Sequence, residues 1–144
     1  MATSTIPTLK ANLRTQLVAR GGLSGVQVSY GAPLPATQRE FIWLGDVNGE
    51  QEYGTYQAPN QRHEMYVLEL ILSVLKEGVD AKAADDRCFA LFAEVETQLR
   101  SDPTVNGAVT ESHLGLFRLT EFTAPDGMNR SAQLVAELNC QAWI

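Results

Sequence analysis

The clearest hydrophobic pattern in the chain lies between Met65 and Val74. One alternating set of positions in this segment is wholly apolar: Tyr66, Leu68, Leu70, Leu72 and Val74. The other set includes Glu69 and Ser73. A period of two indicates a strand with one buried face and one half-exposed face. We therefore expect a long strand here, on which the rest of the fold is built.

A helical pattern follows this strand after the short link Lys76-Glu77-Gly78 and extends from about Ala81 to Arg100. Its apolar residues recur at helical spacing: Cys88, Leu91, Phe92, Val95 and Leu99. Residues at this spacing share one face of a helix. Because the link is short, the strand and the helix are expected to cover each other. A unit of this size can nucleate one domain, so residues 1–144 are interpreted as a single domain.

The N-terminal part of the chain predicts a short helix and two strands. The helix begins near Ser4 or Thr5, has Pro7 in its first turn and ends at Gly21-Gly22. Its apolar positions are Leu9, Leu13, Leu17 and Val18. A first strand covers Val26 to Tyr30, and prolines 33 and 35 mark an extended loop after it.

The segment after this loop predicts a strand over Glu40 to Leu44 that stops at Gly45-Asp46. The polar, acidic stretch Asp46 to Glu52 contains Asn48-Gly49, a pair that favours a tight reversal. A third, weaker strand is expected over Glu52 to Gln57, before a turn at Ala58-Pro59-Asn60.

The C-terminal part predicts a loop and a hairpin. Asp102-Pro103 ends the long helix, and a loop covers Thr104 to Ser112. Strands cover about Leu114 to Phe122 and the last 14 or so residues, with a turn at Pro125-Asp126-Gly127. The last strand alternates cleanly, with these residues on one face: Ala132, Leu134, Ala136, Leu138, Cys140, Ala142 and Ile144. This order of elements predicts an α+β fold with a single, mainly antiparallel β-sheet packed by the N-terminal helix and the long central helix.

Composition narrows the classes of function. The chain carries 11 Lys and Arg against 17 Asp and Glu, a net charge of −6. This balance argues against general attraction to phosphates, although it allows DNA to pass through an acidic channel. Cys88 and Cys140 are expected to be buried free thiols. No signal peptide or membrane-spanning run is visible, so a soluble protein is expected.

Catalytic and metal-binding motifs are not found in the sequence. His63-Glu64 lacks the second histidine of a zinc-protease motif and is interpreted as a solvated strand end. His63, His113, Cys88 and Cys140 have no local ligand spacing. We therefore expect no enzyme activity, no metal and no cofactor. The remaining alternative of this class is a small cytoplasmic enzyme or ligand-binding domain whose pocket is lined by tyrosines: Tyr30, Tyr53, Tyr56 and Tyr66.

The two tryptophans have different expected roles. Trp43 lies within an apolar strand pattern, Phe41 to Leu44, and is expected in the core. Trp143 lies on the polar face of the last strand, which favours either a subunit contact or packing under the first helix.

Several stretches together resemble one known family. They are Val28-Ser29-Tyr30-Gly31-Ala32-Pro33, Phe41-Ile42-Trp43-Leu44-Gly45-Asp46-Val47, Arg62-His63-Glu64 before the long strand, Asp102-Pro103-Thr104-Val105-Asn106-Gly107 after the long helix, and the alternating last strand. In order and spacing, from Leu9 to Ile144, they resemble the tail terminator or tail-completion proteins of long-tailed bacteriophages, a family of the minor-tail and neck group.

The resemblance implies a virion structural protein of the tail and neck region, assembled in the host cytoplasm. Such subunits form a ring, expected to be hexameric, that caps the tail tube, stops its polymerisation and offers a docking surface to the head. The implied partners are further copies of the chain, the tail tube protein and a head-tail connector or stopper. DNA would pass through the lumen without specific binding, and no membrane is involved. The runner-up is a head-tail connector, stopper or other neck protein of the same virion.

A closed ring needs two different patches that meet on neighbouring subunits. The acidic loop Asp46 to Glu52 and the loop Pro103 to Ser112 are candidates for contacts with tube or connector; an ordinary solvated loop is the alternative for each. The candidate contact residues are Asp46, Val47, Asn48, Glu50, Glu52, Pro103, Val105, Asn106 and Trp143.

Overall fold

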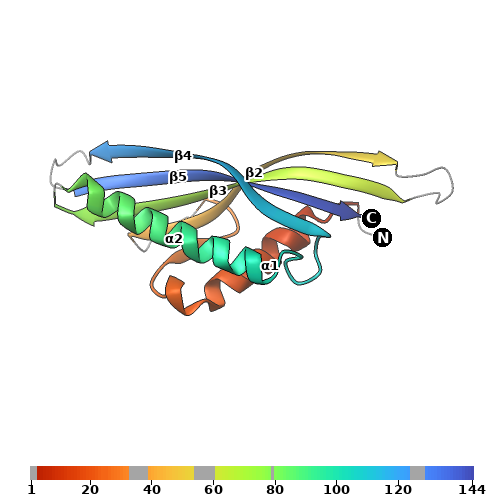
Figure 1. Ribbon diagram of the computed structural model, residues 1–144, viewed down its shortest axis with the longest axis horizontal. Helices are drawn as coiled ribbons and strands as arrows, with labels where there is room; N and C mark the ends of the chain where they lie inside the picture. Colours follow the sequence, from red (N-terminus) through yellow and green to blue (C-terminus); the bar gives the residue numbers. More distant parts are fainter. Residues whose placement is uncertain (1–2, 33–38, 54–60, 79, 124–128) are drawn as a thin grey trace.

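The computed structural model describes residues 3–32, 39–53, 61–78, 80–123 and 129–144. The elements, in chain order, are α1 (Ile6–Ala19), the 3-10 turn η1 (Gly21–Leu23), β1 (Gln27–Ser29), β2 (Glu40–Tyr53), β3 (Arg62–Glu77), α2 (Ala81–Ser101), β4 (Glu111–Thr123) and β5 (Asn129–Trp143). Figure 1 shows a long twisted sheet with both helices on one side of it.

The five strands form one sheet in the order β1-β2-β3-β5-β4. β1 is parallel to β2, and all the other neighbours are antiparallel. β3 lies at the centre and pairs along its length with β2 on one side and β5 on the other. The predicted α+β class, with a mainly antiparallel sheet and two helices, is confirmed.

The core lies between the helices and the sheet. Every second residue of β3 and β5 is buried on the helix side, as the alternation of each strand predicts. α1 contributes Leu9, Leu13 and Leu17, which are fully buried. Val18, expected on the same stripe, is 57% exposed, because it directly follows Leu17 and one residue is a rotation of about 100° around a helix.

The long helix begins and ends as its sequence indicates. The Asp80 side chain accepts a hydrogen bond from the Lys82 backbone N–H at 3.1 Å and caps the helix. Gly78 before it has φ +94°, a conformation that favours glycine. The residues Ala84, Cys88, Leu91, Val95 and Leu99 are buried, so the predicted stripe faces the sheet.

The largest difference from the sequence prediction is in β2. The strand does not stop at Gly45-Asp46, and Asn48-Gly49 makes no reversal. It continues to Tyr53, which pairs with Arg62. A register shift between Leu44 and Val47 absorbs the polar residues there, so the acidic stretch is an edge strand and not a loop.

The distal parts of β2 and β3 form an arm at the right of Figure 1, and the last residues of β5 pair with the β3 side of this arm. Residues 48–53 of the arm are exposed. The predicted strand beyond Tyr53, the turn at Ala58-Pro59-Asn60, the prolines at 33 and 35, and the turn at Pro125-Asp126-Gly127 lie outside the described residues.

Candidate assembly surfaces

Two long stretches of strand edge, one on β2 and one on β4, have no neighbouring strand among the described residues. β1 pairs only with Phe41 to Trp43 of β2, so β2 has no outer neighbour from Leu44 to Tyr53. β4 is the last strand at the other side of the sheet. An unpaired edge presents backbone N–H and C=O groups that a further strand can bind. These two edges are the first candidate contacts.

Five of the sequence-predicted contact residues lie on the β2 edge. Asp46, Asn48, Glu50 and Glu52 are exposed, and Val47 is half-buried. Asn48, Glu50 and Glu52 pair with Val67, Met65 and His63, on the sheet face turned away from the helices. The structure therefore places Glu50 and Glu52 on one face of one strand, although the sequence placed them in a loop, and Asp46 lies within the register shift. Their role in assembly stays a prediction.

Glu64 lies opposite Gln51 near the end of this arm and is 2% exposed, so its interpretation as a solvated strand end is wrong. Its carboxylate accepts hydrogen bonds from the Thr5 N–H (2.9 Å), the Thr5 hydroxyl (2.6 Å) and Gln51 Nε2 (2.8 Å). Burial alone would raise its pKa, but hydrogen bonds from Ser4, Thr5 and Gln51 outweigh burial and hold the pKa below its ordinary value. This network attaches the segment before α1 to the arm.

The sheet face away from the helices forms the second candidate surface, which we call the open face. Phe41 and Trp43 lie on it half-buried, with ring centroids 6.2 Å apart. The expected core position of Trp43 is therefore wrong, since no described element covers this face. Glu69 and Glu137 pair directly across β3 and β5 on it. Like charges at opposed positions destabilise a sheet, and neither carboxylate has an ion pair among the described residues.

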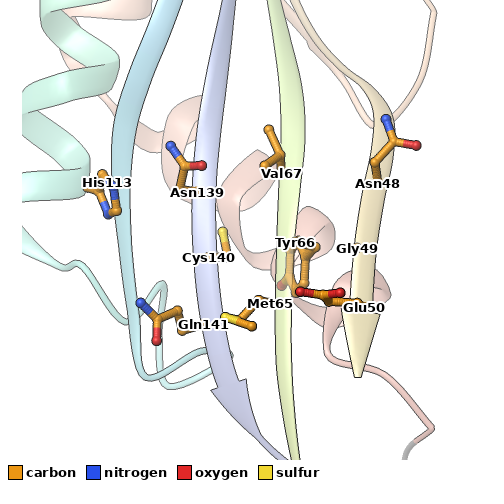
Figure 2. A pocket seen from close by; sticks show the side chains of 10 residues that line it. All are labelled: Asn48, Gly49, Glu50, Met65, Tyr66, Val67, His113, Asn139, Cys140 and Gln141. Carbon is orange, nitrogen blue, oxygen red and sulfur yellow. The ribbon is translucent and has the colours of Figure 1, made fainter. Parts of the chain in front are cut away.

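A shallow hollow of about 550 Å³ lies on the open face, and its lining comes from four adjacent strands (Figure 2). Asn48, Val67, Asn139 and His113 run across it from β2 to β4. Most of the lining is neutral, and Glu50 and His113 lie on different strands at opposite sides of it. The hollow therefore offers a surface for contact with a partner. Its lining residues do not bring an acid and a base together for catalysis.

Trp143 lies at the end of the open face. Its side chain is 50% exposed and its ring lies 4.7 Å from that of His63, the residue opposite it on β3. Packing under the first helix is therefore wrong for Trp143. An exposed tryptophan on the rim of a sheet is a good anchor for a partner, and its role as a contact remains a prediction.

The segment after α2 is built differently from the predicted open loop. The side chain of Val105 is fully buried with φ 49°, so it cannot serve as a surface contact. The Asp102 carboxylate accepts hydrogen bonds from the Thr104 hydroxyl, the Asn106 N–H and Gln16 Nε2, which lower its pKa. Pro103 and Asn106 are exposed and remain candidates.

A third surface, at β4, was not found by sequence reasoning. Phe117 is 56% exposed and lies 6.1 Å from Phe89 and 5.8 Å from Phe92, ring centroid to ring centroid. Leu116 beside it is 74% exposed. A register shift between Leu114 and Phe117 breaks the alternation of β4, so its two faces could not be assigned from sequence. Exposed aromatic residues on an edge strand are typical of an interaction surface.

The cysteines and tyrosines of the described chain are further candidates for functional groups. Cys88 and Cys140 are free and buried, as expected, and burial raises their pKa values to about 11 and about 12. Within the described residues no group of three or more potential metal ligands occurs, and no helix is long and apolar enough to cross a membrane. Tyr66 is buried on the helix side of the sheet, with its hydroxyl 3.1 Å from that of Thr5, whereas Tyr30 and Tyr53 are exposed and Tyr56 lies outside the described residues.

Comparisons with known proteins give a likeness in structure. No protein-family model matches the chain, and no curated protein matches it in sequence. Among solved structures, the chain is similar to one from the "Virion of native gene transfer agent (GTA) particle", with a TM-score of 0.52 and 14% sequence identity. The alignment covers 98% of this chain and 100% of the other. The two chains therefore share a fold over their whole lengths.

Proposed function

We propose that the protein is a virion structural protein that forms a ring at the end of a viral tail, as a tail terminator. The ring, expected to have six subunits, caps the tail tube, stops its polymerisation and gives the head a surface to dock on. The observation that carries this proposal is the end-to-end structural match to a chain of a gene transfer agent virion. The resemblance of the sequence to tail-completion proteins is independent of that match and points to the same class.

The surfaces of the chain suit assembly better than catalysis. Two strand edges that no other described strand pairs with lie on opposite sides of the sheet, and they can supply the two different patches that a heterologous ring requires. Aromatic residues are exposed at β4 and at the end of β5. The acids Glu69 and Glu137 on the open face have no ion pair within the part of the chain that the structure describes, and a net charge of −6 favours a channel from which DNA is repelled.

The test is a tube-elongation assay. Purified tail tube protein is polymerised with and without this chain, and tube lengths are measured by negative-stain electron microscopy. Tubes that stop growing and carry a ring at one end support the terminator. Unchanged tubes, together with binding of the chain to purified portal or connector, support the runner-up, a head-tail connector or stopper. Binding to neither overturns both.

The acidic lumen is tested separately. Asp46, Glu50 and Glu52 are changed together to lysine, with Asp86 and Glu96 on the outer surface of α2 changed to lysine as the control. The proposal expects the first variant to slow DNA ejection from assembled particles and the control to leave it unchanged. Unaltered assembly and ejection in the first variant would refute the lumen assignment.

A further inference from the structure

We propose that the free edge of β4 in one copy of the chain pairs antiparallel with the free edge of β2 in the next copy, with Arg118 opposite Glu52 and Phe117 opposite Tyr53. This inference deepens the proposed ring and rests on it. It assigns the subunit contact to two backbone edges and fixes their register.

Strand directions permit this contact without turning a subunit over. β2, β3, β5 and β4 alternate in direction along the sheet, so β2 and β4 run in opposite directions. A neighbour placed beside β2 with the same orientation therefore offers an antiparallel β4. Two-fold pairing of β2 with β2 would instead set the acidic residues of one copy against those of the other.

The backbone pattern identifies which residues face each free edge. Arg62 and Ile144 exchange two backbone hydrogen bonds, of 2.8 and 2.9 Å, so even-numbered residues of β3 bond to β5. The backbone groups of odd-numbered residues of β3 must then bond to β2. The hydrogen bond from the N–H of Leu75, an odd-numbered residue, to the Arg39 carbonyl confirms this. Followed across the sheet, this alternation turns the N–H and C=O groups of four residues outward beyond the register shift of each strand. These residues are 47, 49, 51 and 53 on β2, and 117, 119, 121 and 123 on β4.

Only a few registers satisfy both edges. In an antiparallel pair, outward-facing residues must lie opposite each other. Phe117 can therefore face Tyr53, Gln51 or another odd-numbered residue of the arm, and Arg118 then faces Glu52, Glu50 or Asn48. All these registers keep the helix faces of the two copies on the same side of the joined sheet.

Side-chain chemistry selects one register. With Phe117 opposite Tyr53, two exposed aromatic rings meet on the helix side, where Phe117 is 56% and Tyr53 80% exposed in the single chain. Arg118 then meets Glu52 on the open face, and neither has an ion pair among the described residues. Aromatic pairs and opposite charges are the cross-strand pairs that stabilise sheets.

The test uses a disulfide that only this register can form. Arg118 and Glu52 occupy a non-hydrogen-bonded pair, in which Cα atoms approach to about 4.5 Å, a separation within the range of a disulfide. The variant R118C/E52C is oxidised and analysed without reductant by gel electrophoresis. The matched control, R118C/E50C, carries the same number of cysteines one pair out of register. The native thiols are buried.

We expect a ladder of linked subunits from R118C/E52C and at least about ten-fold less from the control. A wild-type ring with no ladder from R118C/E52C overturns the edge pairing and leaves the ring intact. Stronger linkage in R118C/E50C overturns the register. A wild-type chain that stays monomeric both alone and with tube protein overturns the ring and the edge pairing together.

A second variant tests the backbone contact itself. Glu121→Pro removes an outward N–H of β4 without touching the bonds to β5, a position where an edge strand tolerates proline. Glu121→Ala removes the same side chain and keeps the N–H. We expect the proline variant to lose ring formation in light scattering and the alanine variant to keep it. Equal ring formation by both would refute a backbone contact at this edge.

Discussion

Replacement of Glu64 by glutamine tests the buried network that joins the segment before α1 to the β2-β3 arm. The glutamine keeps the size of the side chain and removes its charge. Three donors, from Thr5 and Gln51, point at the carboxylate at 2.6 to 2.9 Å. An amide presents one oxygen and an NH₂ group to these donors, so at least one of them loses its acceptor in a site that is 2% exposed to water.

The expected cost follows from those contacts. Hydrogen bonds to a charged group are worth more than neutral ones, and a buried donor left unpaired costs its full desolvation. We therefore expect a loss of about 2 to 3 kcal/mol in the free energy of unfolding at neutral pH. For a chain of this length, that corresponds to a fall in Tm of roughly 5 to 10 °C.

The pH dependence gives an independent check. Because the pKa of Glu64 is lowered in the folded chain, its carboxylate contributes stability that is complete above the ordinary glutamate pKa. That contribution is lost as the pH falls through the lowered value. The gap between wild type and E64Q should therefore be widest near pH 7 and shrink below about pH 4.

The assay is urea unfolding followed by circular dichroism at several pH values, at concentrations low enough to keep the chain unassembled. Glu50→Gln is the control, an exposed acid on the same arm, with an expected effect within about 0.5 kcal/mol. If E64Q is as stable as E50Q at pH 7, or if its deficit persists unchanged in acid, the reasoning from the network is wrong.

Three further predictions concern other parts of the chain. Gly49→Ala should destabilise by about 2 kcal/mol in urea unfolding, since a Cβ there lies 2.5 Å from the Tyr66 Cβ; Gly21→Ala, with open space around it, should change little. Asp85 raises the pKa of Glu121 by a hydrogen bond and by its charge, so ionisation of Glu121 opposes folding; Asp85→Asn should stabilise the chain at pH 7 and less so at pH 4, and an equal effect at both would contradict this coupling. Both thiols should be unreactive to a thiol reagent at pH 8 in the folded chain and react after unfolding, because burial raises their pKa values; prompt reaction of the folded chain would contradict their burial.

The central strand and long helix were predictable because the information is local. In β3, α2 and β5, one face is buried against the other layer, so apolar residues recur with the period of the element. The distal half of β2 carries no such signal, since Asn48 to Tyr53 meet solvent on both faces. It forms a strand through its backbone bonds to β3, which a single sequence does not reveal.

The sequence identified several residues of the candidate surfaces, but it did not predict how these residues are arranged in space. The acids of the arm were identified from their composition, but their common face depends on pairing with β3. Glu64 is buried because Thr5 comes to it from 59 residues earlier in the chain, and nothing near Glu64 in sequence indicates this. Val105 faces inward because of a left-handed backbone at that position, which its residue type does not predict.

β2 and β4 each contain a register shift, and these shifts determine where the two strands can lose or gain residues. The irregularity between Leu44 and Val47 sets which residues of the arm face the helices, and the one between Leu114 and Phe117 does the same for β4. At each place two residues of one strand, Gly45 and Asp46 on β2 or Gly115 and Leu116 on β4, lie opposite a single residue of the neighbouring strand. Deleting one of the two would leave everything beyond it on the same face, whereas deleting one residue further along the strand would exchange the two faces of everything beyond the deletion. A single-residue deletion should therefore be tolerated at the two irregularities, whereas elsewhere in these strands insertions and deletions should be tolerated in pairs.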